Sequence, residues 1–304
     1  MKIVKWVGAI LGGIVALVLV VGGGFVALKA RAFDASMAKV YDVQPLAQVM
    51  RSSDPAVIER GRHIAESIGG CATRDCHGAD LGGGKEMKFG PLGTITGPNI
   101  TTGGHLRDYS DGELARLIVH GIKRDGHSVT FMPSQDLNWL PDDDLAALVS
   151  YLRVAPAIDK PDGKVSLGLI AKVLDQADKM PIDIARRIDH GKRTTAPSPS
   201  PNATYGAYLA RACQGCHGEG LSGGPIPGAP PTLPVPKNIT PHETGIKEWS
   251  FDDFNRLLTT GVKKDGKQVD PFMPIEALGK MNDLERHALW AHLEGHTPVP
   301  FGHR

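Results

Sequence analysis

The sequence has almost no excess of charge of either sign. Among its 304 residues, 34 are Lys or Arg and 33 are Asp or Glu, so the formal net charge is only +1. Domains that bind nucleic acid usually carry a clear basic excess. We therefore expect no nucleic-acid partner. The length fits about two domains at roughly 150 residues each.

Cysteine is scarce, and its few copies are grouped. The chain has four cysteines in two pairs, each pair directly followed by a histidine: Cys71, Cys76 and His77, then Cys213, Cys216 and His217. If all four serve these two motifs, none remains for a disulfide. Strand-like alternation of apolar and polar residues is also absent, which favours a helical chain.

The second motif, Cys213-Gln-Gly-Cys216-His217, has the spacing by which a chain attaches haem covalently. Two thiols add to the two vinyl groups on one edge of the porphyrin, and the adjacent imidazole then lies under the ring, where it can bind iron. Half of a zinc site and a local disulfide are the alternatives. Zinc needs a second pair of ligands, which does not stand nearby, and a disulfide leaves His217 unexplained.

The first motif departs from this spacing, because four residues separate Cys71 from Cys76 before His77. Two interpretations are open. A bulge of two residues can bring both thiols to the vinyl groups, or Cys76 alone is bonded. Taken by itself this motif is a weak signal, and the comparison of the two halves of the chain is what strengthens it.

The two halves of the chain repeat at a nearly constant offset. Four separated segments match, at an offset of 140 for the first three and 141 for the last: His77 with His217, Tyr109-Ser110 with Trp249-Ser250, Gly121–Gly126 with Gly261–Gly266, and Phe131-Met132-Pro133 with Phe272-Met273-Pro274. Agreement at four places indicates an internal repeat. We therefore predict two copies of one haem-binding domain, at 56–156 and 203–299, and two covalently bound haem c groups.

The repeat also selects the second axial ligand of each iron. Met132 lies 55 residues after its motif histidine and Met273 lies 56 after its own, each within Phe-Met-Pro. A lone Met beside Phe usually packs in a core, but two copies at matching distances favour ligation, and a thioether raises the potential of the haem. His120 and His127 could compete in the first copy; Thr and Lys occupy the matching positions of the second.

Helices are expected around each haem. Ser110–Glu113 and Ser250–Asp253 have the form of helix starts with capping boxes. The segments 98–101 and 237–240, Pro-Asn-Ile-Thr and Lys-Asn-Ile-Thr, stand at similar distances after the motifs, and a backbone carbonyl there could accept the imidazole proton. The predicted fold is all-α, with two tandem copies of a haem-binding domain behind a membrane helix.

The N-terminus carries the one long apolar run. Val7 to Leu28 holds 22 residues without a charge, which as a helix spans about 33 Å, enough for a hydrocarbon core of about 30 Å. We predict a single membrane anchor at 1–32. A cleaved signal peptide is the alternative, because Ala30-Arg31-Ala32 has the small-x-small form, although the run exceeds the roughly 7 to 15 apolar residues usual in a signal peptide. Flanking lysines and arginines do not settle the orientation.

The remaining segments carry no motif, and their composition indicates connecting regions. Residues 33–55 are predicted to be a tether and 157–202 a linker that contains an amphipathic helix within Ser166 to Lys179. Residues 300–304 are predicted to be a short tail.

Both copies resemble class I c-type cytochrome domains over about residues 58–299. The second is similar to cytochrome subunits of membrane-bound alcohol and aldehyde dehydrogenases, because Asn-Ile-Thr-Pro, Glu-Thr-Gly-Ile, Trp-Ser, Gly-Val-x-x-Asp-Gly and Phe-Met-Pro follow one another between 238 and 274. Those subunits commonly carry three haems, whereas this chain has motifs for two. The resemblance implies a single-pass protein of the cytoplasmic (inner) membrane with its haem domains on the periplasmic, outer face.

Iron held by His and Met has no open coordination position, which suits electron transfer better than catalysis. We therefore predict a dihaem electron carrier of the respiratory chain, not an enzyme, with His77, Met132, His217 and Met273 as iron ligands. Its expected redox partners are a dehydrogenase subunit, an oxidase or another cytochrome. The alternatives are a dihaem peroxidase or thiosulfate-oxidising enzyme, and a subunit of a haem-copper terminal oxidase.

Overall fold

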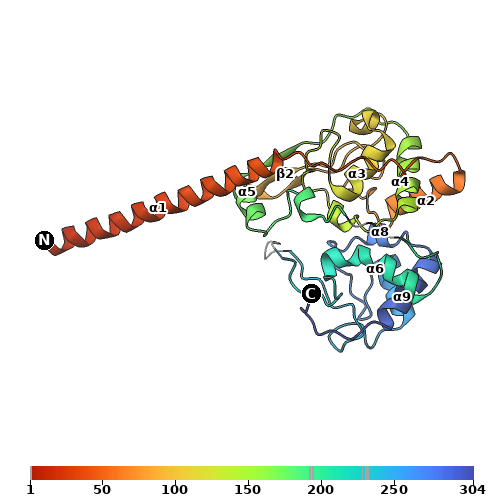
Figure 1. Ribbon diagram of the computed structural model, residues 1–304. Helices are drawn as coiled ribbons and strands as arrows, with labels where there is room; N and C mark the ends of the chain where they lie inside the picture. The colour runs from red at the N-terminus through yellow and green to blue at the C-terminus, as the bar shows by residue number, and fades with distance from the viewer. Residues whose placement is uncertain (1, 192, 194, 228, 230–232) are drawn as a thin grey trace.

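One long helix leads into two stacked units of helices and loops (Figure 1). The computed structural model describes residues 2–191, 193, 195–227, 229 and 233–304. Its helices, in chain order, are α1 (Lys2–Met37), α2 (Pro55–Glu66), α3 (Asp111–His120), α4 (Asp142–Val154), α5 (Leu169–Gln176), α6 (Ala203–His217), α7 (Phe251–Thr260), α8 (Ile275–Leu278) and α9 (Asp283–Glu294). The prediction of a mostly helical chain is confirmed.

A small sheet corrects the all-α prediction. Strands β1 (Met87–Lys88), β2 (Gly93–Ile95) and β3 (Val165–Leu167) pair antiparallel in the order β1-β2-β3. Each strand has only two or three residues, too few for a period of two to be visible in the sequence. The sheet also joins β3, from the stretch predicted as a linker, to the first unit.

The first unit is built on a close crossing of α2 and α4. A Cβ added at Gly61 would lie 1.9 Å from the carbonyl oxygen of Ala147, so only glycine permits this approach. Ile64 of α2, Leu114 of α3 and Leu148 of α4 are fully buried in the resulting core. The first turn of α3 is closed by the predicted capping box at its N-terminus.

The second unit repeats this arrangement with α6, α7 and α9. A Cβ added at Gly206 of α6 would lie 1.9 Å from the carbonyl oxygen of Ala288 in α9. Tyr205, Leu209 and Leu289 fill the core beside this crossing. Ser250 and the carboxylate of Asp253 form the predicted capping box of α7.

The backbone of the two units also corresponds outside the helices. Left-handed backbone conformations recur at the 140-residue offset in five pairs: Gly78 and Gly218, Leu81 and Leu221, Gly83 and Gly223, Gly121 and Gly261, and Gly126 and Gly266. Leucine rarely adopts a positive φ, so its recurrence at matching positions is specific. The sequence repeat is therefore also a repeat of local conformation.

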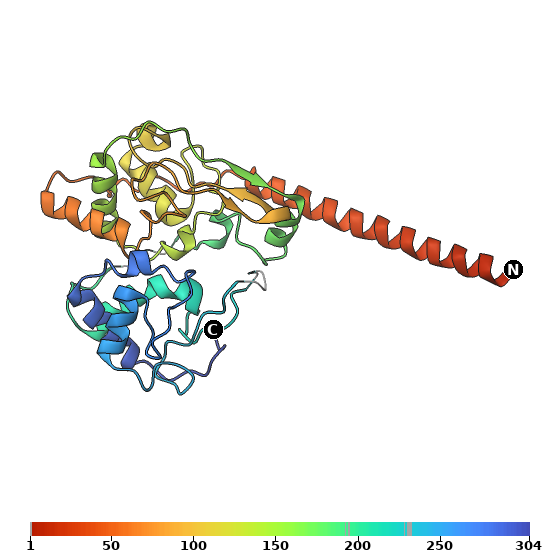
Figure 2. The same cartoon turned by 180° about the vertical axis from the view of Figure 1, so that it is seen from behind.

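Helix α1 projects from the first unit and is longer than predicted (Figures 1 and 2). Its segment Ile10–Met37 is apolar and long enough to cross a membrane. Close packing begins at Phe33, which is only 3% exposed and contacts Ala171 and Ile182. The helix does not end at residue 32 but continues to Met37.

The predicted tether and linker are both packed parts of the first unit. After α1, Tyr41 and Val49 are buried, and the Leu46 N–H donates to the Gly112 carbonyl at 3.1 Å. The stretch 157–202 supplies β3 and also α5, which lies along the end of α1. Residues 33–55 therefore do not form the predicted tether, because they pack against the first unit. The predicted linker helix is present as α5, but it packs against α1.

The two units share an interface built around the buried carboxylate of Glu285. Arg60 of α2 contacts Asp144 of α4 at 3.0 Å and Glu285 of α9 at 3.2 Å. His63 of α2 also contacts the Glu285 carboxylate, at 2.7 Å. One continuous cluster of buried apolar residues includes side chains from both units.

Candidate haem sites

The first motif lies on a series of turns that follows α2. The Cys76 N–H donates to the Thr73 carbonyl at 3.1 Å, and the His77 N–H donates to the Cys71 carbonyl at 3.2 Å. These turns accommodate the two additional residues of the motif. They place Cys71 against the core, whereas Cys76 is exposed. All four cysteines lie within the described residues, and all four are free thiols.

His77 is oriented by a backbone carbonyl. Its Nδ1 lies 2.9 Å from the Pro98 oxygen, and because a carbonyl can only accept, Nδ1–H donates. The other ring nitrogen, Nε2, then carries a free lone pair that can bind a metal. Burial lowers the pKa of His77, which favours the neutral imidazole that ligation requires. The carbonyl acceptor expected within 98–101 is therefore present.

A cavity of about 320 Å³ adjoins His77. Its lining includes both His77 and Met132, together with Cys71, and it is otherwise largely apolar, with Ile100, Leu106, Leu114, Leu117, Ile118 and Val165 among its side chains. An imidazole, a thioether and a thiol around an apolar space are the donor set that a covalently attached haem requires. The residues present therefore fit the group.

The structure separates Met132 from its two competitors. Met132 lines the cavity, whereas neither His120 nor His127 belongs to its lining. His120 is buried, with its Nδ1 3.3 Å from Nδ1 of His190. His127 lies 3.3 Å from the Asp125 carboxylate at the surface. Only the methionine shares a space with His77.

The second motif occupies the last turn of α6, where the standard spacing fits a continuous helix. His217 repeats the contact of His77, because its Nδ1 lies 2.7 Å from the Lys237 carbonyl oxygen. Burial lowers the pKa of His217 and raises the pKa of the Cys213 thiol to about 12. Met273 is half-buried and packs against the core of its unit.

Two residues near the second motif carry no recognisable signal in the sequence. Arg304, in the predicted tail, donates through Nη1 to the carbonyls of Cys216 at 2.8 Å and Gly224 at 2.9 Å. Asp136 comes from the first unit, and a Cβ added at Gly215 would lie 3.1 Å from its carboxylate. Burial there raises the pKa of Asp136. Both contacts join segments that are distant in sequence, so no local motif reveals them.

Comparison with known proteins assigns the first unit. Residues 58–155 match the family model of cytochrome c. This segment is a cytochrome c domain. Such a domain implies covalently bound haem c, in agreement with the His, Met and Cys side chains around the cavity.

Several relatives are cytochrome subunits. The chain is 39% identical over 103 residues to the gluconate 2-dehydrogenase cytochrome c subunit of Pantoea cypripedii, covering 31% of this chain and 23% of that protein. It is 34% identical over 102 residues to the alcohol dehydrogenase (quinone) cytochrome c subunit of Gluconacetobacter polyoxogenes, covering 31% and 22%. The diheme cytochrome c-type protein of Cereibacter sphaeroides is 32% identical over 111 residues, covering 33% and 36%.

The chain thus spans between 22% and 36% of the length of these three relatives. The cytochrome c domain and the relatives together indicate electron transfer, and they agree with a carrier that has no catalytic activity of its own.

Proposed function

We propose that the chain is a membrane-anchored dihaem c-type cytochrome. It passes single electrons between a dehydrogenase or another donor, on the periplasmic face of the cytoplasmic membrane, and the respiratory chain. The observation that carries this proposal is the repeated histidine contact. In each unit the motif histidine donates Nδ1–H to a carbonyl about 20 residues later, at 2.9 Å to Pro98 and 2.7 Å to Lys237.

When bound, haem c supplies a one-electron couple between ferric and ferrous iron. His77 and His217 would each offer Nε2, held in direction by the carbonyl on the opposite ring nitrogen. Met132 and Met273 would offer the second axial ligand of each iron. A thioether favours the reduced state, and two protein ligands leave no position for a substrate.

Both cysteines of the first motif are proposed to bond to haem. Cys71 supports this, because it lines the same cavity as His77 and Met132 despite the lengthened spacing. Cys76 immediately precedes His77, as Cys216 precedes His217. The turns between Cys71 and Cys76 provide the bulge that the longer motif needs.

The two haems are proposed to exchange electrons within the chain. The 3-10 turn Ser134–Asp136, which follows Met132, contacts helix α6. The Asp136 carboxylate approaches Gly215, between the two cysteines of the second motif. Trp139 and Tyr208 pack edge-to-face across the same interface, with ring centroids 5.0 Å apart. The methionine side of the first site therefore adjoins the cysteine side of the second.

Helix α1 is proposed to be an uncleaved anchor. Its apolar segment is long enough to cross a membrane, and its exposed apolar side chains continue to Leu28, just before packing against the first unit begins. The named relatives that are cytochrome subunits of dehydrogenases support a dehydrogenase as the donor.

Haem stoichiometry and ligation test the proposal. The full chain, produced with a haem c maturation system and extracted from membranes in detergent, should contain two haems per chain by the pyridine haemochrome assay. Both irons should be low-spin and should resist carbon monoxide. One haem per chain, or a native iron that readily binds carbon monoxide or peroxide, would contradict it. Steady-state peroxidase activity of the prereduced protein would favour the peroxidase alternative.

Purification from native membranes tests the partner. A tagged chain should bring with it the catalytic subunit of a dehydrogenase. Copurification with the subunits of a haem-copper oxidase would instead assign it to a terminal oxidase.

A further inference from the structure

The two methionine loops are held by different surroundings. We infer that residues 182–185, here termed the clamp, position Met132 as an iron ligand and keep it there, whereas Met273 has no equivalent support among the residues that the structure describes. The inference rests on the proposed function, because it assumes that both methionines bind haem iron. It assigns a role in the first haem site to a segment between the two units.

The clamp is hydrogen-bonded to Phe131 and to the residues just before it. Thr130 pairs with Asp183 in an isolated antiparallel bridge, and the Phe131 N–H donates to the Ile182 carbonyl at 3.0 Å. The Ser128 hydroxyl accepts from the N–H groups of Ile184, at 3.1 Å, and of Ala185, at 2.9 Å. The side chains of Ser128 and of all four clamp residues are fully buried. Opening the loop would therefore expose several hydrogen bonds that are now shielded from water.

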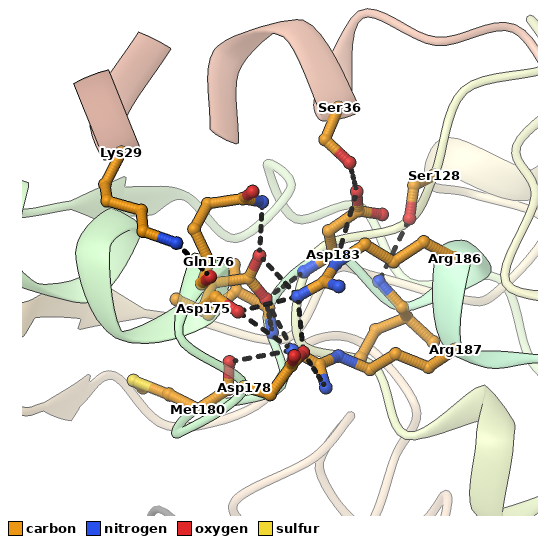
Figure 3. A network of polar contacts seen from close by, with 12 residues as sticks. Lys29, Ser36, Ser128, Asp175, Gln176, Asp178, Met180, Asp183, Arg186 and Arg187 are labelled. Carbon is orange, nitrogen blue, oxygen red and sulfur yellow. Dashed lines mark hydrogen bonds and ion pairs between the residues drawn. The ribbon is translucent and has the colours of Figure 1, made fainter. Parts of the chain in front are cut away.

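The clamp is itself fixed by a buried carboxylate. Asp175 accepts from the N–H of Ile182 at 2.9 Å and from that of Asp183 at 3.1 Å (Figure 3). The same carboxylate forms ion pairs with Arg186 at 3.3 Å and Arg187 at 3.1 Å. Because its charge and its lone pairs are both satisfied, this buried group can hold the clamp in one conformation.

Helix α1 supports the clamp from the other side. Figure 3 shows Ser36, near the end of α1, pointing toward Asp183, and its hydroxyl donates to the Asp183 carboxylate. Lys29 of α1 donates to the Gln176 carbonyl at 3.0 Å, next to Asp175. The C-terminal end of α1, which follows the predicted membrane anchor, is therefore connected through the clamp to the methionine loop of the first haem site.

The backbone of Phe131 has an unfavourable conformation, which contacts with other segments must maintain. Its φ is +66°, in the left-handed region that non-glycine residues seldom occupy. Such a conformation persists only where its surroundings determine it. In the matching segment of the second unit, Phe272 is not among the residues with a positive φ.

The second methionine loop lies at the surface. Gln268, the counterpart of Ser128, is exposed, and Phe272 is 43% exposed. The N–H groups of Phe272 and Met273 both donate to Asp270, within the loop itself, at 2.9 Å. The beginning of the loop has the same backbone pairing in both units, because Val262 pairs with Gln268 as Ile122 pairs with Ser128. The two loops differ in what packs outside this pairing: the clamp covers the first loop, and the second loop is exposed.

Replacement of an axial methionine by an external ligand requires its loop to open. We expect imidazole to replace Met273 in the ferric protein faster than Met132. Ser128→Ala removes the acceptor of two buried N–H groups, and its expected effect is about a tenfold or greater acceleration at Met132 alone. Gln268→Ala is the matched control at the same position of the second unit, and it should leave both rates unchanged.

The experiment uses the full chain with both haems in detergent. In the reduced protein, NMR should resolve two methionine methyl signals displaced by the haem ring currents, one for each ligand. In the oxidised protein the paramagnetic iron displaces the same methyl signals, and the loss of each signal after imidazole is added gives the two rates. Hydrogen exchange of the Phe131 amide reports the clamp independently of the iron, and it should accelerate in Ser128→Ala.

Two outcomes separate the two proposals. Fewer than two displaced methyl signals in the native protein would contradict the proposed function. Two signals, with Phe131 exchange and the Met132 rate unchanged in Ser128→Ala, would overturn the clamp alone. Ser36→Ala loosens the clamp from α1 and tests it if Ser128→Ala does not fold. A smaller acceleration at Met132 is expected there, and no acceleration would overturn the clamp.

Discussion

Cys71 and Cys76 lie in different environments at the residue scale, and this bears on how the first haem is attached. Cys71 lines the cavity, and burial raises the pKa of its thiol to about 12, whereas Cys76 is exposed. A thiol that faces the cavity is placed to reach a vinyl group. The lengthened spacing alone leaves open whether one or two thioether bonds form, and the position of Cys71 favours two.

Replacing Cys71 with alanine should therefore remove one of two thioethers. The variant retains one vinyl group in conjugation, so the reduced pyridine haemochrome of its first haem should absorb at longer wavelength than that of the native protein. Cys213→Ala should cause the same change at the second haem and serves as the control. Peptide mass spectrometry checks the bonds directly. A Cys71 that can be alkylated in the native holoprotein would show a single thioether.

His120 should make the first unit sensitive to acid. Burial, and next the charge of His190, lower its pKa from 6.5 to about 4. Between these values the unfolded chain binds a proton that the folded chain does not, so stability is full above pH 6.5 and falls as the pH drops toward 4. The expected loss is about 3 kcal/mol.

Urea unfolding at pH 7 and pH 4.5 measures this effect. His120→Gln should reduce the difference in unfolding free energy between the two pH values. Equal stability of the native protein at both values would contradict the assignment.

The helix pairs of the two units depend on glycine at the element scale. At Gly206 the nearest atom to an added Cβ is a backbone oxygen of α9, which cannot rotate away as a side chain can. Gly206→Val should therefore force α6 and α9 apart and destabilise the second unit by roughly 3 kcal/mol or more. Ala207→Val, on the exposed side of α6, is the matched control. A thermal midpoint equal to that of the control would rule out the crossing as a determinant of stability.

The interface residue Glu285 joins the two units at the scale of the whole molecule. This carboxylate is 1% exposed, accepts from Arg60 and His63 of the first unit, and caps α9 through the Asn282 N–H. Burial raises the pKa of this carboxylate, but His63, the Asn282 N–H and the charge of Arg60 together outweigh burial and hold the pKa below its usual value. The two units should therefore unfold together.

Glu285→Gln retains a capping side chain but removes the charge. We expect about 3 kcal/mol of destabilisation, because Arg60 loses one of its partners at a buried position. Calorimetry should resolve two transitions in place of one. Asp253→Asn, which changes the equivalent capping residue of α7 away from the interface, should keep a single transition. A single transition in both variants would show that other contacts maintain the coupling.

Features that depend on neighbouring residues can be recognised in the sequence alone. The motif at Cys213, the positions of Met132 and Met273, and the capping box at Ser110 are all encoded within a few residues or in the repeat. Helix starts follow from local hydrogen bonding, and a repeat is visible without any knowledge of the fold. For these reasons the helical architecture and the candidate haem ligands could be predicted.

The way in which distant segments meet is visible only in the folded chain. It placed Cys71 in the cavity, brought Asp136 to the second motif, and packed the stretches predicted as tether and linker against the first unit. Composition marks such stretches only as irregular, because the contacts that order them join residues far apart in the chain. The clamp beside Met132 is one of these contacts, so the difference between two nearly identical sequence motifs arises outside them.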